Sequence, residues 1–292
     1  MSLNRTYQNL IAETLKNGRV VVTRGSSTRE ILGCGFDLEN PRDRLITLPS
    51  RKMSLPLAFG EFCWHLSVST SVEFLSYYAS IWKNFSEDGE SISGSCYGHS
   101  IFSASHTNSQ WNKVKQLLQR DPNSRRAVLQ FYDHNLGLDE TILDISCTMF
   151  TQFFIRENKL DCLTFMRSND IILGLPYDIF FFTMLHEIMA AELGVGLGTY
   201  SHRVGSMHIY DHHLDWAKKI LKDSPQESAG MPPMQGIEQI SSFLDAEELI
   251  RVNHWDSVSE QINKVDLNEY WMELLNVFIT FKQKKRNKEY AK

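Results

Sequence analysis

Cys147 is the clearest candidate for a nucleophile in this sequence. It stands in Asp-Ile-Ser-Cys-Thr, directly before a segment with the pattern of a strand. A nucleophilic cysteine needs a lowered pKa, which nearby cations can provide. Candidate cations stand at Arg125, Arg126 and Arg167. A single cysteine can also be a small core residue, so this segment leaves both interpretations open.

The three arginines also suit a phosphate group. They stand beside hydroxyl side chains, in Asn-Ser-Arg-Arg and in Arg-Ser-Asn-Asp. The planar guanidinium fork matches the oxygens of a phosphate dianion, which favours a nucleotide or another phosphate ester as ligand. For any one of these arginines, a surface salt bridge is the alternative.

Further polar residues follow along the chain. Asp170 and Asp178 enclose a glycine and a proline between apolar residues, and Asp178 stands at the mouth of an apolar helix. Aspartate is a preferred N-cap, so capping is one interpretation of Asp178. His208 and Tyr210 are two residues apart, so on a strand both would face one ligand. The alternative is a half-buried polar pair.

Hydrophobic patterning predicts the elements that must position these residues. Apolar residues at helical spacing predict helices over 6–17, 111–120 and 211–222, and a buried central helix over 178–193. Runs of β-branched and aromatic residues predict strands over 19–23, 127–132, 149–156 and 159–165. Residues 24–30 indicate a polar turn, 223–236 a loop before a further strand and helix, and 282–292 a solvated charged tail.

Length and composition predict one folded domain. The chain has 292 residues, of which 42% are hydrophobic and 22% charged, as in globular proteins, which excludes a disordered or collagen-like chain. No linker divides the chain clearly. We therefore predict one α+β domain over residues 1–292, with a mixed sheet packed on a buried helix.

Charge and cysteine content exclude several classes of partner. The net charge of −5 argues against non-specific nucleic-acid binding. The five cysteines are odd in number and lack CxxC spacing, so we expect no disulfide framework, no metal site and a cytoplasmic setting. No apolar run approaches the roughly 18 residues that span a bilayer, so no membrane association is expected.

An ordered set of motifs resembles the thymidylate synthase family. The set is Ser124-Arg125-Arg126, Cys147, Arg167-Ser168-x-Asp170, Gly174-Leu175-Pro176 and His208-Ile209-Tyr210. It extends towards the N-terminus through Tyr7, Gly18, Arg24, Glu61 with Trp64, Ile81-Trp82 and Tyr97-Gly98. The resemblance covers residues 5–222, whereas residues 223–292 match the family poorly.

The resemblance implies a C5-transferase that acts on a pyrimidine nucleotide with 5,10-methylenetetrahydrofolate as one-carbon donor. It also implies a twisted mixed sheet and a homodimer that packs sheet on sheet. Cys147 would add to C6 of the pyrimidine, and Glu61 would organise water and proton transfer around the base. The remaining roles implied are phosphate binding by Arg24, Arg167, Ser168 and the partner subunit's Arg125 and Arg126, sugar binding by His208 and Tyr210, and folate binding by Trp82, Asp170 and Gly174.

The chain departs from the pattern of the family's methylases at four places. Ser146-Cys147-Thr148 replaces Pro-Cys-His, Gly205-Ser206 replaces Gly-Asp, and a charged end replaces a short apolar tail. Asp178 replaces an asparagine. The asparagine amide matches uracil, which offers a donor at N3 and an acceptor at O4.

Asp178 favours cytosine instead. Cytosine accepts at N3 and donates from its 4-amino group, so a carboxylic acid can donate to N3 and accept from the amine. Against uracil the carboxylate would leave a buried polar group unpaired, at a cost of about 1–3 kcal/mol. The same residue is typical of the cytidylate hydroxymethylases within the family.

The expected reaction ends with water rather than hydride. Both branches form a Cys–pyrimidine adduct and then an exocyclic methylene at C5, and hydride transfer needs a closed, dry site. The altered tail and nucleophile flanks favour water addition, which gives 5-hydroxymethylcytidylate and tetrahydrofolate. A dUMP methylase, a dUMP hydroxymethylase and a non-catalytic nucleotide-binding relative are the alternatives. The retained Ser168, Arg125 and Arg126 favour dCMP, while CMP stays open.

Overall fold

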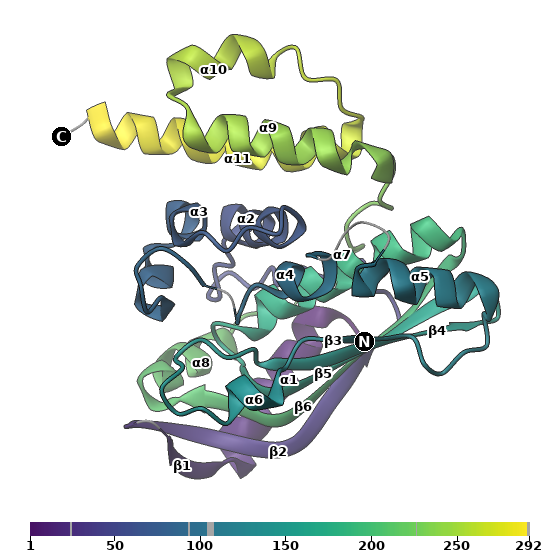
Figure 1. Ribbon diagram of the computed structural model, residues 1–292. Helices are drawn as coiled ribbons and strands as arrows, with labels where there is room; N and C mark the ends of the chain where they lie inside the picture. Colours follow the sequence, from purple (N-terminus) through teal and green to yellow (C-terminus); the bar gives the residue numbers. More distant parts are fainter. Residues whose placement is uncertain (24, 93, 104–107, 226, 291–292) are drawn as a thin grey trace. The chain divides into compact units, whose positions relative to one another are not determined.

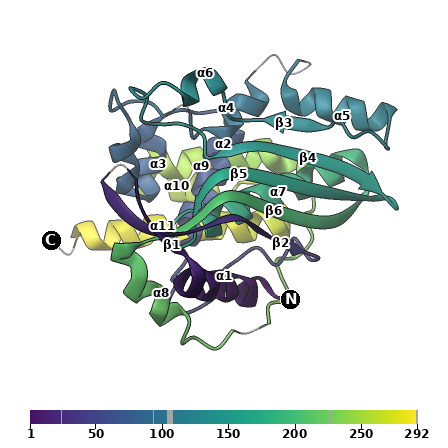
Figure 2. The same ribbon diagram turned by 90° about the horizontal axis from the view of Figure 1, so that it is seen from below.

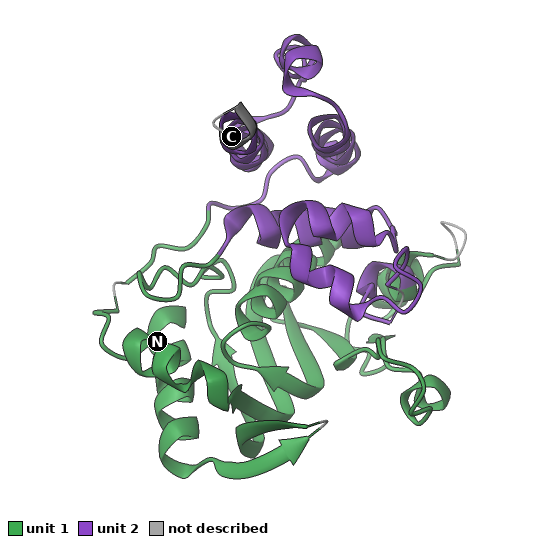
Figure 3. Ribbon diagram, turned by 90° about the vertical axis from the view of Figure 1, so that its left-hand side faces the viewer, with its two compact units in different colours: residues 1–53, 100–231 green, residues 54–99, 232–292 purple. Residues whose placement is uncertain are grey.

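Figure 1 shows the computed structural model, which describes residues 1–292 except 24, 93, 104–107, 226 and 291–292. Of residues 288–290 only the backbone is described. The chain divides into two compact units that each combine separate stretches of sequence (Figure 3). Residues 1–53 and 100–231 form the first unit, and residues 54–99 and 232–292 form the second. The single catalytic domain over residues 1–292 stays a prediction.

The first unit is built on a six-stranded sheet in the order β1-β2-β6-β5-β4-β3 (Figure 2). The strands are β1 (Arg19–Thr23), β2 (Ser26–Leu38), β3 (Val128–Gln130), β4 (Thr148–Arg156), β5 (Lys159–Asp170) and β6 (Gly196–Tyr210). β5 and β6 are parallel, and every other neighbouring pair is antiparallel. A parallel pair needs a long crossover, which α7 (Leu175–Leu193) supplies. The mixed sheet and the α+β class are therefore confirmed.

The buried central helix is confirmed as α7, which packs against β5 and β6. It begins three residues earlier than predicted, because Pro176 lies in its first turn, where the missing N–H of proline costs no hydrogen bond. It ends at Gly194, whose φ of 68° is the left-handed conformation that favours glycine at a helix end. The other helices of this unit are α1 (Leu3–Asn17), α5 (Gln110–Arg120), α6 (His134–Gly137), η2 (Asp211–His213) and α8 (Leu214–Ile220).

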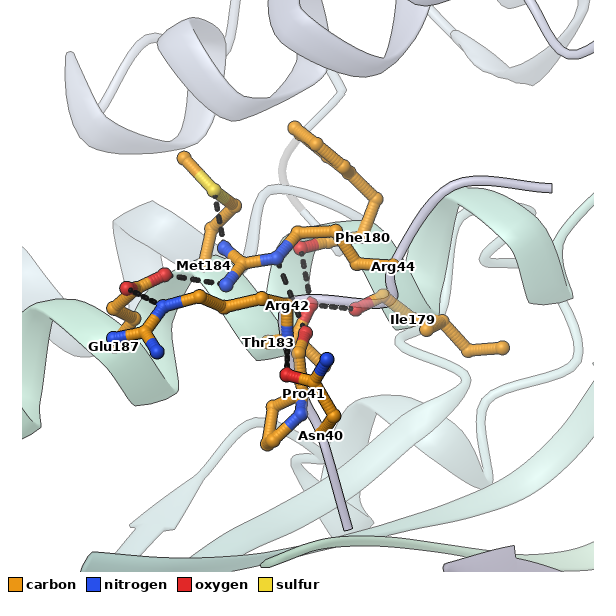
Figure 4. A network of polar contacts seen from close by, with 9 residues as sticks. All are labelled: Asn40, Pro41, Arg42, Arg44, Ile179, Phe180, Thr183, Met184 and Glu187. Carbon is orange, nitrogen blue, oxygen red and sulfur yellow. Dashed lines mark hydrogen bonds and ion pairs between the residues drawn. The ribbon is translucent and has the colours of Figure 1, made fainter. Parts of the chain in front are cut away.

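A buried ion pair anchors residues 41–44 to α7 (Figure 4). Arg44 is fully buried, and its guanidinium forms a short ion pair with Glu187. Arg42 contacts the other oxygen of the same carboxylate, with 2.6 Å between Nε and Oε1. Arg44 also donates to the carbonyl of Pro41 at 3.1 Å, so the chain around residue 42 is held on the helix.

Glu187→Gln should lower the free energy of unfolding by about 3–5 kcal/mol, because it leaves the buried Arg44 charge without its counter-ion. Urea unfolding followed by circular dichroism measures the change. Asp215→Asn is the matched control, since it breaks the exposed pair between Asp215 and Lys218. It should change the midpoint very little. Equal losses in the two variants would contradict this prediction.

The second unit is helical. It comprises α2 (Leu55–Leu66), α3 (Val72–Tyr78), η1 (Ser80–Phe85), η3 (Ile237–Gln239), α9 (Ile240–Val252), α10 (Trp255–Ile262) and α11 (Glu269–Tyr290), and the residues of α4 (Tyr97–Phe102) are divided between the two units. Aromatic rings fill its core, where Phe278 lies 5.5 Å from Tyr78 and 6.1 Å from Phe243 between ring centroids. Glu247 is buried beside Tyr78 and pairs with Arg251 at 2.9 Å.

Three predictions about local structure were wrong. Residues 26–30 belong to β2 rather than to a turn, because pairing with β1 and β6 satisfies their backbone groups despite the polar side chains. No described residue after Tyr210 lies in a strand, and helices follow the loop instead. The charged run continues α11 through Tyr290, where Lys285 lies 3.8 Å from the centre of the Tyr77 ring.

None of the described helices is both long and apolar enough to cross a membrane.

Candidate active site

Cys147 stands immediately before β4, is half-buried and forms no disulfide. Arg167, on the neighbouring strand β5, holds the backbone that carries it. The Arg167 amide donates to the carbonyl of Cys147 at 2.9 Å. Its guanidinium donates from Nε to the carbonyl of Ser146 at 3.0 Å and from Nη2 to that of Ile145 at 3.1 Å. The tertiary structure thus brings the predicted nucleophile and a predicted cation together.

The residues on either side of Cys147 are both buried. The Ser146 hydroxyl donates to the carbonyl of Thr148 at 2.6 Å, which stabilises the entry into β4. The Thr148 hydroxyl finds no hydrogen-bond partner within the described parts of the chain. The Ser146 hydroxyl therefore helps to hold the segment that carries Cys147.

Strands β5 and β6 change their buried face at the level of the predicted site. Along β5 the buried positions pass from Met166 to Asn169, and along β6 from Val204 to Met207, so the alternation shifts by one residue in both strands. Ser168 pairs with Ser206 at this level. Because the shifts coincide, the strands stay in register while their side chains exchange faces.

This exchange of faces places Asp170, His208 and Tyr210 on the same face of the sheet. Asp170 pairs with His208 across β5 and β6, and both are half-buried. The rings of His208 and Tyr210 are 5.1 Å apart, which confirms that these two side chains face the same side. The Asp170 carboxylate accepts from the backbone N–H of Ile172 at 2.8 Å. Burial raises the pKa of Asp170, against the lowering effect of this hydrogen bond and of His208.

Asp178 lies in the first turn of α7, and its side chain does not cap the helix. Gly174 is the N-cap, so the capping interpretation was wrong. Instead, Asp178 Oδ2 accepts from Nδ2 of Asn169 at 2.7 Å. A Cβ at Gly174 would lie 3.2 Å from that Nδ2 and 3.4 Å from Oδ2. Glycine therefore leaves room for the Asn169–Asp178 pair at the start of the helix.

The environment of Asp178 favours its protonated form. Desolvation, together with the nearby charge of Asp170, raises the pKa of Asp178 to about 7, although the hydrogen bond from Asn169 lowers it. Part of its surface stays accessible, although protein atoms surround the carboxyl. Near neutral pH the group can therefore either donate or accept a proton, as an acid–base or hydrogen-bonding residue requires.

A model of the family described as thymidylate synthase matches residues 5–263, which is most of the chain. The chain belongs to the thymidylate synthase family. It is 28% identical over 231 residues to the thymidylate synthase of Buchnera aphidicola subsp. Schizaphis graminum, and the match covers 76% of this chain and 85% of that protein. The match to the family extends beyond residue 222, further than the motifs indicated.

Membership of the thymidylate synthase family confirms the predicted class of chemistry, a transfer of one carbon to C5 of a pyrimidine nucleotide. It also confirms 5,10-methylenetetrahydrofolate as the donor, which supplies the transferred carbon when bound. The structure adds Asn169 and Arg51 to the candidate site residues. The sequence motifs did not single out either of them. Asn169 stands inside the Arg-Ser-Asn-Asp motif, so its position in the sequence was a usable signal.

The folate donor has an aromatic part and an anionic part, and residues of the first unit fit both parts. Arg51 is 3% exposed, and its Nε and Nη2 have no hydrogen-bond partner among the described residues. Its guanidinium lies 5.6 Å from the centre of the Tyr177 ring, in the first turn of α7. Arg51 could therefore hold a carboxylate of the donor, next to Tyr177.

The remaining predicted residues are placed as follows. Arg125 and Arg126 are both exposed before β3, and Arg24 lies outside the described residues. Glu61 is half-buried on α2, and Trp82 lies on η1 with its ring 6.2 Å from that of Trp64, both in the second unit. Their predicted roles towards base and folate stay predictions.

Proposed function

We propose that this protein is a cytidylate 5-hydroxymethylase. It combines dCMP or CMP, 5,10-methylenetetrahydrofolate and water, and it releases the 5-hydroxymethyl nucleotide and tetrahydrofolate. The observation that carries the proposal is the Asp178 carboxyl, which has a pKa raised to about 7 and is held by Asn169. A protonated carboxyl donates to N3 of cytosine and accepts from its 4-amino group.

Asn169 supports this assignment because it occupies one oxygen of Asp178. Its Nδ2 donates to Oδ2, so Oδ2 acts as an acceptor there and the acidic proton is carried on Oδ1. That arrangement presents an O–H donor, with the second lone pair of Oδ2 as an acceptor, to a base with the pattern of cytosine. Uracil offers a donor at N3, so the O–H of Asp178 would face another donor instead of an acceptor.

Cys147 is the nucleophile of the proposed reaction. Its sulfur forms a bond to C6, which makes C5 nucleophilic towards the one-carbon unit. C5 then forms a bond to the donated carbon and loses its proton, while the bond from that carbon to tetrahydrofolate breaks and its electron pair stays on the folate nitrogen. Water adds to the resulting exocyclic methylene, and the Cys147–C6 bond then breaks, which restores the C5–C6 double bond and the thiolate. Arg167 supports this step because it fixes the backbone of residues 145–147 through three hydrogen bonds. Glu61 organises water and proton transfer around the base.

The phosphate and the sugar are bound by polar residues near the strand ends. Arg24, Arg167 and Ser168 hold the phosphate, while His208 and Tyr210 contact the 3′-hydroxyl, and Trp82, Asp170 and Gly174 line the folate. Arg125 and Arg126 are exposed, which allows them to reach the phosphate of a second subunit in a homodimer. The exposed Val20, Val22 and Leu32 of β1 and β2 support a subunit interface on the sheet.

A second candidate is a dUMP methylase, favoured by the similarity to a protein named thymidylate synthase. Tritium release separates the candidates. Purified protein, the folate donor and C5-tritiated dCMP, CMP or dUMP are incubated in parallel, and products are examined by mass spectrometry. Release from a cytosine nucleotide with a gain of CH₂O and no dihydrofolate is expected. Release only from dUMP, with a gain of CH₂ and dihydrofolate, would overturn the proposal.

The affinity for a cytosine nucleotide should fall as the pH rises through about 7, where Asp178 loses the proton that it donates to N3. Well above that pKa the affinity should drop about tenfold per pH unit. Calorimetric titration of the Cys147→Ser variant with dCMP or CMP measures this without titration of the nucleophile. The same titration of Asp178→Asn should show no such transition. A wild-type affinity that stays level through this range would contradict the role of protonated Asp178.

A further inference from the structure

A chain of hydrogen bonds leads from Asp178 into the core of the first unit. Asn169 donates from Nδ2 to Asp178 and accepts at Oδ1 from Nε2 of His202 at 3.0 Å. Nδ1 of His202 lies 2.9 Å from the Tyr200 hydroxyl. His202 and Tyr200 are fully buried on β6, and Asn169 is 4% exposed on β5.

The chemistry of the three side chains determines the direction of every bond. Burial lowers the pKa of His202 to about 3, so the ring is neutral and carries one proton. The carbonyl oxygen of Asn169 can only accept, which places that proton on Nε2. Nδ1 is then an acceptor, and the Tyr200 hydroxyl donates to it. The direction is therefore Tyr200 to His202, His202 to Asn169, and Asn169 to Asp178.

Packing holds this chain in one arrangement. The Phe36 ring stacks on His202 with 5.2 Å between centroids and 23° between planes. The Tyr200 hydroxyl also contacts Thr164, whose own hydroxyl lies 3.0 Å from that of Thr151. A buried polar network that is satisfied throughout has one low-energy pattern of donors and acceptors.

We infer that His202 is a positioning residue for base recognition: it sets the orientation of the Asn169 amide and thereby decides which oxygen of Asp178 carries the proton. This inference rests on the proposed function, in which Asp178 addresses the base. Tyr200 acts one step further back, since its hydroxyl donates to Nδ1 of His202 and thereby stabilises the form of the ring with the proton on Nε2.

The opposite orientation of the Asn169 amide would change which base Asp178 prefers. If the Asn169 carbonyl faced Asp178, Oδ2 would have to carry the proton to make that hydrogen bond. Oδ1 would then be an acceptor only, without a proton for N3 of cytosine. A base with a donor at N3, such as uracil, would lose its disadvantage. The amide orientation is therefore a switch between two base preferences, and His202 holds it in one of them.

The test compares variants by their affinity for dCMP and dUMP, measured by calorimetry without folate. His202→Phe keeps a flat ring but removes the donor, and it should reduce the dCMP-to-dUMP affinity ratio about tenfold or more. His202→Gln, whose amide can donate to Asn169 Oδ1, should restore most of the ratio. Tyr200→Phe should give a smaller reduction than His202→Phe. Thermal unfolding by circular dichroism verifies that each variant is folded.

His186→Phe is the matched control, because His186 is also fully buried with a lowered pKa, and its Nε2 bonds instead to the carbonyl of Leu160. It should alter stability and leave the affinity ratio unchanged. If His202→Phe leaves the ratio unchanged, or if His186→Phe lowers it equally, the inference is overturned while the cytosine preference of the wild type stands.

A second measurement does not depend on the substrate. Nitrogen-15 NMR of the histidine rings should show His202 as the Nε2–H form, with no titration in the range where exposed histidines titrate. An Nδ1–H form would overturn the inference even if cytosine is the base. A wild type that prefers uracil overturns the proposed function, and the NMR result then still tests the direction of the hydrogen bonds separately.

Discussion

Cys147→Ser should abolish turnover, with a loss of at least about 10³-fold in the rate of tritium release. A serine hydroxyl is not ionised near neutral pH and cannot form the bond to C6 that activates C5. Nucleotide affinity should stay close to that of the wild type, because other side chains are proposed to bind the phosphate and the base. Tritium release and calorimetric titration with the nucleotide measure the two effects separately.

Cys34→Ser is the matched control, because Cys34 is also half-buried and outside any disulfide, on strand β2 of the same unit. It should retain activity. Turnover that survives in Cys147→Ser would exclude Cys147 as the nucleophile. A wild type that binds nucleotide without releasing tritium would instead identify the protein as a non-catalytic relative.

Asp178→Asn should reverse the preference between the bases. An asparagine at this position can accept the hydrogen bond from Asn169 at its oxygen and present its N–H groups to O4 of uracil. Cytosine would then oppose its 4-amino donor to the amide donor. Each unpaired buried group costs about 1–3 kcal/mol, so kcat/KM for the cytosine nucleotide should fall about 5- to 150-fold.

The ratio of kcat/KM for dCMP and dUMP is the quantity to measure, since any loss of folded protein cancels in it. Asp161→Asn is a suitable companion variant, because Asp161 lies earlier on β5 and accepts from the backbone of Thr199 at 2.8 Å. It should leave the ratio unchanged. A ratio that also stays unchanged in Asp178→Asn would show that another residue selects the base.

The main elements of the fold follow from local patterns of residues. The all-round apolar character of residues 178–193 predicted the buried helix α7, because no face of such a helix is stable in water. The motif order indicated the family and its one-carbon donor, which the comparison confirmed. By contrast, the polar side chains of residues 26–30 concealed the start of β2, since pairing with β6 depends on residues far away in the sequence.

The sequence by itself determined which chemical groups are present: a cysteine before a strand, arginines for a phosphate, and a carboxyl at Asp178 in place of an amide. Only the tertiary structure decided how these groups are held. The shift in alternation at Ser168 and Ser206 turns Asn169 inwards, where it meets Asp178 and His202, 33 residues away in the sequence. The direction of a hydrogen bond and the pKa of a carboxyl depend on neighbours in space, and the folding of β5, β6 and α7 brings those neighbours together.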